Sequence, residues 1–156
     1  IKYYLWFILK KITLLIGSFL VFSMAFSQNN KTEHYLDKEY QKCLQENLGN
    51  LGERRCQSEF EDKWDKEMNQ NYFELIELIE IHMDTIHGVE TIDSITLTNL
   101  RTAQRKWLKY RDAEFKLISK IYDRKGSMYY TIATYRRMSI VRKRALELKY
   151  YCNTFQ

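Results

Sequence analysis

The chain has 156 residues, with 29% charged and 45% hydrophobic side chains and a formal net charge of +5. This length allows one domain with a modest hydrophobic core, so we expect no second domain. Proline is absent, glycine is scarce, and no run of alternating polar and apolar residues occurs, which argues against a β-sheet and favours an all-α fold.

The N-terminus has the pattern of a secretory signal peptide. Lys2, Lys10 and Lys11 precede a mostly apolar segment, and residues 25–27 then provide small side chains at the two positions that a signal peptidase reads. We expect cleavage directly after these residues. The pattern therefore predicts export to the periplasm or out of the cell.

We accordingly divide the chain into a signal peptide, residues 1–27, and a mature helical domain, residues 28–156. The alternative is an uncleaved membrane anchor over residues 3–26, which the two lysines inside that span disfavour. No cysteine follows the apolar segment, so the pattern does not predict a lipoprotein. Without the three lysines of the signal peptide, the mature domain has 22 basic and 20 acidic residues, a net charge of +2.

Charge is distributed unevenly along the mature domain. Residues 28–99 contain 7 basic and 16 acidic residues, a net charge of −9, whereas residues 100–156 contain 15 basic and 4 acidic residues, a net charge of +11. The simpler interpretation is that an acidic helical hairpin packs against a basic one and the charges pair along their seams. The functional alternative is an exposed face of one sign that attracts an oppositely charged partner.

Three cysteines in an exported protein allow one disulfide and leave one thiol over. A turn at residues 49–52 would bring Cys43 and Cys56 side by side on antiparallel helices, so we predict a disulfide between them. Closing a loop of this size stabilises a small domain by roughly 3 kcal/mol. Cys152 is then left buried, free, or joined to a second chain.

Apolar residues recur every three or four positions along the mature domain, which predicts amphipathic helices. We expect them at about residues 32–47, at 53–83, from Thr91 or Asp93 to about 124, and at 128–151, with a loop at 84–91. Thr32 and Ser127 are the expected N-caps of the first and last helices. The expected core-facing residues are Tyr35, Leu36, Tyr40 and Leu44; Cys56, Phe60, Trp64, Met68, Tyr72, Leu75 and Ile79; Leu97, Leu100, Gln104, Trp107, Arg111, Ile118 and Ile121; and Ile132, Tyr135, Met138, Val141, Ala145 and Leu148. Together these predict a small antiparallel bundle of three to four helices with one disulfide.

Polar residues interrupt two of the apolar stripes. Asp65 and Asn69 lie one turn apart on the second helix, and Gln104 and Arg111 lie seven residues apart on the third. Because buried polar groups must find partners, we expect Arg111 to reach the Asp65 carboxylate, with Gln104 and Asn69 completing a network that fixes helix register. The full set predicted for this structural network is Trp64, Asp65, Asn69, Gln104, Trp107, Arg111 and Asp112.

The sequence contains no recognisable catalytic arrangement of a nucleophile with a base, no metal-ligand cluster and no phosphate-binding loop, so we predict neither an enzyme nor a cofactor or metal. The histidines, at positions 34, 82 and 87, are too dispersed to suggest a metal site. The alternative, paired carboxylates for glycan hydrolysis, would use Asp65 with Glu61 or Asp112 with Glu114. An arginine partner keeps Asp65 ionised and unsuited to acid catalysis.

The basic residues between positions 136 and 144 would suit a polyanion. Export argues against nucleic acid as that polyanion. An anionic envelope polymer or a lipid headgroup is the better counterpart, and we expect no small-molecule substrate.

Taken in order, these motifs resemble the lysozyme-inhibitor LprI-like N-terminal domain family over essentially the whole mature domain. The residues that carry the resemblance are Trp64, Asp65, Met68, Asn69, Tyr72, Gln104, Trp107, Tyr110, Arg111, Asp112, Gly126, Ser127 and 144–148. Cys43 and Cys56 match the first two of the four cysteines that this family often has. Phe115 and Arg136 stand where the other two are expected, so both members of that pair are missing.

The resemblance implies an exported, helical envelope protein. Some members of that family are credited with inhibiting lysozyme. Its partner would then be a lysozyme-like protein, contacted either by acidic residues of the second helix or by a basic residue that enters the acidic catalytic cleft. The candidates for the cleft are Arg124 and Lys125. The candidates for acidic contact are Glu59 and Asp62, from a pool that also includes Glu61, Glu74, Glu77 and Glu80. The alternative function is an envelope interaction module without activity against lysozyme.

Overall fold

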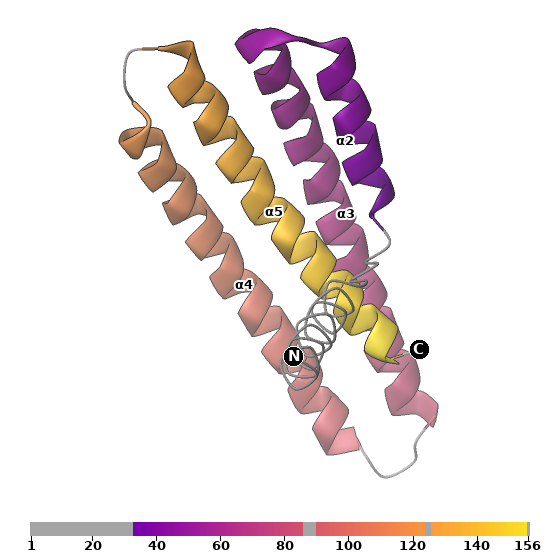
Figure 1. The fold of residues 1–156 in the computed structure, drawn as a ribbon. Helices are drawn as coiled ribbons and strands as arrows, with labels where there is room; N and C mark the ends of the chain where they lie inside the picture. The colour runs from indigo at the N-terminus through magenta and orange to yellow at the C-terminus, as the bar shows by residue number, and fades with distance from the viewer. Residues whose placement is uncertain (1–32, 86–89, 124–125, 156) are drawn as a thin grey trace, which may run out of the picture. The chain divides into compact units, whose positions relative to one another are not determined.

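The computed structural model describes residues 33–85, 90–123 and 126–155, and within these ranges the secondary structure is helical, without a strand. The helices are α2 (Tyr35–Glu46), α3 (Gly49–Thr85), α4 (Glu90–Ile121) and α5 (Ser127–Phe155), and successive helices run in opposite directions (Figure 1). The predicted all-α bundle is therefore confirmed. The predicted signal peptide lies outside the described residues.

The turn between α2 and α3 is shorter than the sequence suggested. Residues 49–52 form the first turn of α3 instead of the connection, which is left to Asn47 and Leu48. Gly49 has a φ of 82°, a conformation that favours glycine. A Cβ on Gly52 would lie 2.3 Å from the carbonyl oxygen of Asn47, so the two glycines permit this close reversal.

Two predicted helix starts are also wrong. The N-cap of α2 is His34, whose Nδ1 accepts a hydrogen bond from the backbone N–H of Leu36 at 3.3 Å, so the helix begins three residues after Thr32. The imidazole nitrogen serves as the acceptor that a Thr, Ser or Asp side chain usually provides. α4 begins at Glu90, before either predicted cap.

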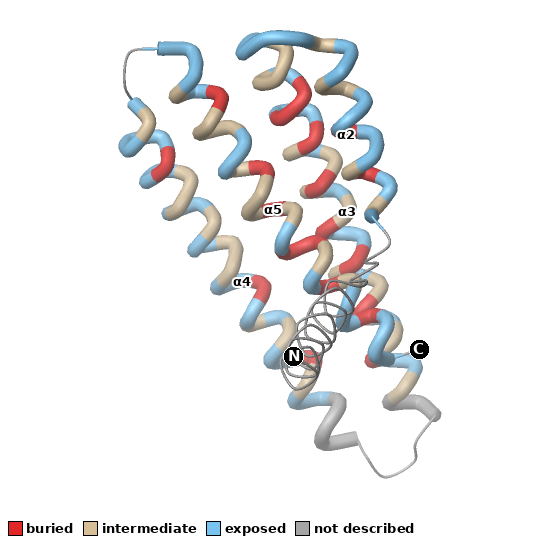
Figure 2. The backbone as a smooth tube through the Cα atoms, viewed as in Figure 1, coloured by how far each residue is buried: buried red, intermediate tan, exposed pale blue. Residues whose placement is uncertain are grey.

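The core lies mainly between α3 and α5, the two helices that pack along each other most extensively. Figure 2 shows buried positions repeating along both helices, whereas α4 is mostly intermediate or exposed. The buried hydrophobic residues are Leu36, Tyr40, Cys56, Phe60, Trp64, Met68, Leu75, Ile79, Leu97, Ile118, Met138, Val141, Ala145, Leu148 and Cys152. The predicted stripes supply nearly all of them.

Three residues predicted to face the core are exposed. Tyr35 lies in the first turn of α2 and directs its hydroxyl to the Glu67 carboxylate at 2.9 Å, while Ile121 is the last residue of α4. Tyr135 of α5 lines an open pocket between α2, α3 and α5, and it is half exposed. Helix periodicity predicts a direction, but it cannot predict whether another element covers that direction.

The disulfide between Cys43 and Cys56 is confirmed and joins α2 to α3 with a Cα–Cα distance of 5.9 Å. Of the alternatives left open for Cys152, the structure has it free and fully buried, with its Sγ 3.3 Å from the carbonyl oxygen of Asn71. Burial raises the pKa of this thiol.

Acidic side chains of α2 and α3 pair with basic side chains of α5, as the simpler interpretation of the charge asymmetry predicted. The pairs are Asp37 with Arg142 (2.6 and 2.7 Å), Glu61 with Arg137 (2.6 Å) and Glu74 with Lys149 (3.0 Å). These pairs lie partly exposed at the edge of the core, where α5 meets α2 and α3. Partly exposed ion pairs each contribute only about 0–1 kcal/mol, so they orient α5 more than they stabilise it.

Among the described helices, none has the combination of length and apolar character that crossing a bilayer requires.

Candidate functional site

The first candidate is a polar cluster between α3 and α4. Arg111 contacts Asp65 through Nη1 at 3.1 Å, and its Nε and Nη2 donate to Asp112 Oδ1 at 3.0 and 2.9 Å. Asn69 donates to the second oxygen of Asp65 at 3.2 Å. The guanidinium also lies 5.7 Å from the centre of the Trp107 ring. The predicted contact between Arg111 and Asp65 is thus present, in a half-buried position open to water on one side.

Gln104 does not join this cluster. It is buried, its Oε1 accepts from Arg144 Nε at 3.0 Å, and its Nε2 lies 3.7 Å from the sulfur of Met68. Seven helical residues separate Gln104 from Arg111, a rise of about 10 Å along the axis, so the two cannot meet at one carboxylate. The expectation of a single four-residue network is therefore wrong.

Arg144 was expected to suit a polyanion and to carry the family resemblance, but it was not predicted to belong to a polar network between helices. It is a buried residue of α5 whose Nη1 donates to Glu147 at 2.6 Å, and it lies 5.9 Å from the centre of the Trp107 ring of α4. The available signal was its position directly before Ala145, within the apolar stripe of α5. We interpret the two clusters as positioning contacts for α4, with Trp107 between their guanidinium groups.

Glu61 and Asp65, the first of the two carboxylate pairs of the enzyme alternative, both have arginine partners. Glu61 contacts Arg137 at 2.6 Å and Asp65 contacts Arg111 at 3.1 Å. Burial raises the pKa of Glu61 above its ordinary value of 4.5, although the Arg137 guanidinium opposes this increase. In the described parts of the chain, no group of three or more His, Cys, Asp or Glu side chains is placed to hold a metal ion.

The predicted partner-contact residues fall into three groups. Glu59 and Asp62 are exposed on α3, with Glu59 within 3.0 Å of Lys63. The pooled acids Glu61 and Glu74 are less available than expected, because both pair with α5. The cleft candidates Arg124 and Lys125 lie outside the described residues.

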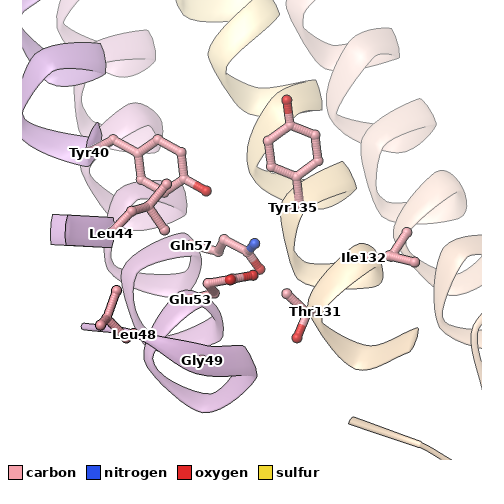
Figure 3. A pocket seen from close by; sticks show the side chains of 9 residues that line it. All are labelled: Tyr40, Leu44, Leu48, Gly49, Glu53, Gln57, Thr131, Ile132 and Tyr135. Atoms are coloured by element: carbon pink, nitrogen blue, oxygen red, sulfur yellow. The ribbon is translucent and has the colours of Figure 1, made fainter. Parts of the chain in front are cut away.

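The second candidate site is a pocket of about 450 Å³ where the end of α2, the start of α3 and the start of α5 meet (Figure 3). Asn50 fixes α5 beside the turn, because its side chain donates to Ser127 Oγ at 2.9 Å and its carbonyl accepts from Thr131 Oγ1 at 3.2 Å. Ser127, the predicted cap, therefore contacts another helix. The residues lining the pocket are Tyr40, Leu44, Leu48, Gly49, Glu53, Gln57, Thr131, Ile132 and Tyr135.

Gln57 is the least exposed polar residue of this pocket, at 4%. Its amide end lies between Tyr40 and Thr131 in Figure 3, and its Oε1 has no hydrogen-bond partner within the described structure. Burial raises the pKa of Tyr40, and the charge of Glu53 adds to the increase. The pocket therefore combines aromatic and aliphatic walls with a carboxylate and an unpaired acceptor.

This geometry defines a class of protein: a small helical domain, joined by one disulfide, with polar clusters between its helices. The family described as Lysozyme inhibitor LprI matches residues 43–148, well over half of the chain, and the chain belongs to that family. The resemblance seen in the sequence is thereby confirmed, and the match includes both cysteines of the disulfide and both polar clusters. No curated protein and no solved structure matches the chain.

Proposed function

We propose that this protein is an exported inhibitor of lysozyme that acts by protein–protein contact in the periplasm or outside the cell. Membership of the lysozyme inhibitor family is the observation that carries the proposal. Export is supported by the signal-peptide pattern of residues 1–27 and by the disulfide, because disulfides persist in oxidising compartments.

The surface that best suits a protein partner is the end of the bundle, which we call the tip and define by Leu48, Leu51, Met128, Tyr130 and Tyr135. All five side chains are exposed although apolar or aromatic. The contacts of Asn50 with α5 hold the two halves of this surface together. Grouped exposed apolar residues beside a concave pocket are typical of protein-binding sites.

The charge of the pocket at the tip also suits a lysozyme. Animal-type lysozymes are basic proteins, so a negatively charged surface would speed association with them and favour the correct orientation. Glu53 supplies negative charge inside the pocket, and the exposed acids Glu59 and Asp62 supply more along α3.

The proposal is tested by clearance of a cell-wall suspension by an animal-type lysozyme. Added protein should slow the loss of turbidity in proportion to its concentration until the enzyme is saturated. The control is the reduced and alkylated protein, in which the bond between Cys43 and Cys56 is lost and inhibition should fall. Clearance at an unchanged rate with excess folded protein would contradict the proposal.

A second candidate function is attachment to an anionic envelope component, favoured by the exposed basic side chains of α4. These are Arg101, Arg105, Lys106, Lys109, Lys116 and Lys120. A protein that serves only this function should sediment with anionic vesicles or wall fragments at low salt, dissociate at high salt, and leave clearance by lysozyme unchanged.

A further inference from the structure

The unpaired oxygen of Gln57 is the feature of the pocket that requires an explanation. A buried amide oxygen without a donor destabilises a folded protein, and nearly all such groups are paired. Gln57 hydrogen-bonds the Tyr40 side chain, yet its Oε1 remains without a partner in the described part of the chain. The oxygen itself is buried, but Gln57 lines an open pocket, so a turn of the side-chain amide would present the oxygen to a donor that enters the pocket.

The pocket also has a negative charge that its basic neighbours do not cancel. Glu53 lines it, one helical turn before Gln57. The next two residues of α3 are arginines, but neither lines the pocket: Arg54 Nε donates to the Asn50 carbonyl at 3.3 Å, and Arg55 donates to the Asn47 side chain. The group that fits is therefore a cation that can donate several hydrogen bonds.

We propose that this pocket receives an arginine side chain from the lysozyme-like partner. A guanidinium has five N–H donors in a planar arrangement, which suits acceptors spread over Glu53, Gln57 and the Tyr40 hydroxyl better than a compact ammonium does. Its plane can stack on a tyrosine ring, and its aliphatic stem can pack against the leucines of the wall. A neutral saccharide would leave the Glu53 charge uncompensated.

The inference rests on the proposed function for the identity of the partner, because a basic lysozyme presents arginines on its surface. The chemistry of the pocket does not depend on that identity. The arginine-binding pocket and the proposed inhibition of lysozyme can therefore be refuted separately.

The first test measures inhibition of an animal-type lysozyme by the full chain, expressed for export and purified as the host processes it. Glu53→Gln removes the charge and keeps the shape, and Gln57→Leu removes the unpaired oxygen. Each should weaken inhibition by about tenfold, the usual range for losing a hydrogen bond to a charged group. Gln57→Leu removes an unsatisfied buried oxygen but also the hydrogen bond to Tyr40, two effects of opposite sign, so its melting temperature should stay close to that of the wild type. A large drop would indicate a structural role for Gln57.

Glu46→Gln is the matched control, since it makes the same change on an exposed residue at the end of α2 that does not line the pocket. It should inhibit like the wild type. Inhibition within twofold of the wild type by both pocket variants would overturn the inference and leave the proposed function standing. Glu53→Gln alone decides the matter if Gln57→Leu does not fold.

The second test needs no lysozyme. N-acetyl-arginine methylamide is titrated into the full chain while the side-chain amide signals of Gln57 are followed by NMR. The expected result is a change in chemical shift that saturates at millimolar concentrations of the probe. The change should be larger than with N-acetyl-lysine methylamide, and it should disappear in Glu53→Gln. The inference would be overturned if a chito-oligosaccharide shifted these signals and the arginine probe did not. It would also be overturned if none of the probes shifted them. A saturable arginine shift without any inhibition of lysozyme would support the pocket and refute the proposed function.

Discussion

α5 and α4 both pack against α3, but by different kinds of contact. α5 buries five hydrophobic side chains along the stripe of α3, whereas Leu97 and Ile118 are the buried hydrophobic residues among the described side chains of α4. α4 packs mainly partly buried side chains such as Trp107 and Phe115 against the core, and it adds the contacts of Arg111 with Asp65 and of Gln104 with Arg144. Apolar burial is strong and has little direction, whereas hydrogen bonds between charged groups have direction and a modest net free energy. The stability of the bundle therefore resides mainly in α3 and α5, and the polar clusters determine where α4 lies.

The largest expected effect is loss of the core on which α5 packs. Trp64→Ala removes a fully buried indole from α3 and should lower the free energy of unfolding by about 3–5 kcal/mol. Chemical denaturation followed by circular dichroism measures this change. Phe73→Ala, at an exposed position of the same helix, is the control and should change stability little. Equal losses in the two variants would mean that the core is not where the structure places it.

A smaller effect is expected where α4 meets α5. Arg144→Met leaves Gln104 buried with its Oε1 unpaired and should cost about 1–3 kcal/mol. Adding Gln104→Leu should recover part of this loss, because both polar partners are then replaced by apolar groups. Native-state hydrogen exchange should report faster opening of α4 than of α5 in the single variant. If the double variant loses more stability than the two single variants lose in sum, the contact is not as described.

The contact between α3 and α4 that faces water should matter less. A double-mutant cycle of Arg111→Met and Asp65→Asn should give a coupling free energy of about 1 kcal/mol or less, because the Asp65 side chain is 41% exposed. The coupling should decrease with added salt. A coupling several times larger would place this ion pair among the main determinants of stability and remove the contrast between α4 and α5.

The smallest effect concerns the charged seam of α5. Burial raises the pKa of Glu61 above 4.5, so ionisation of this carboxyl opposes folding. Relative to Glu61→Gln, the wild type should be most stable below pH 4.5 and should lose that advantage as the pH rises through the raised pKa. Denaturation curves of both proteins across this pH range measure the difference. A relative gain for the wild type with rising pH would mean that Arg137 outweighs burial.

The sequence was sufficient for features that depend on one helix or on neighbouring segments. The spacing of Cys56, Phe60, Trp64 and Met68 predicted the buried face of α3, and the short separation of Cys43 from Cys56 predicted the disulfide. Arg111 and Asp65 could be matched because Arg111 stands in the apolar stripe of α4 and Asp65 stands directly beside the stripe of α3.

Features that require a third helix could not be predicted in this way. The partner of Gln104 is Arg144, and that contact depends on how α5 lies against α4. The pocket likewise needs α2, α3 and α5 at one end of the bundle, and no single segment indicates it. The sequence did contain a signal for Gln57, because a polar amide three residues before Phe60 and seven before Trp64 stands at a core-facing position. Only the structure shows that a pocket lies beside it.

The buried position of Cys152 has a consequence for the maturation of the protein. While the chain is still unfolded in an oxidising compartment, three thiols compete for one oxidation, and a third thiol can attack a disulfide that has already formed. Once α5 is in place, Cys152 has no access to solvent and its raised pKa keeps it in the unreactive thiol form. Docking of the C-terminal helix thus protects the correct crosslink from exchange, so folding itself ends the period in which the cysteines can mispair.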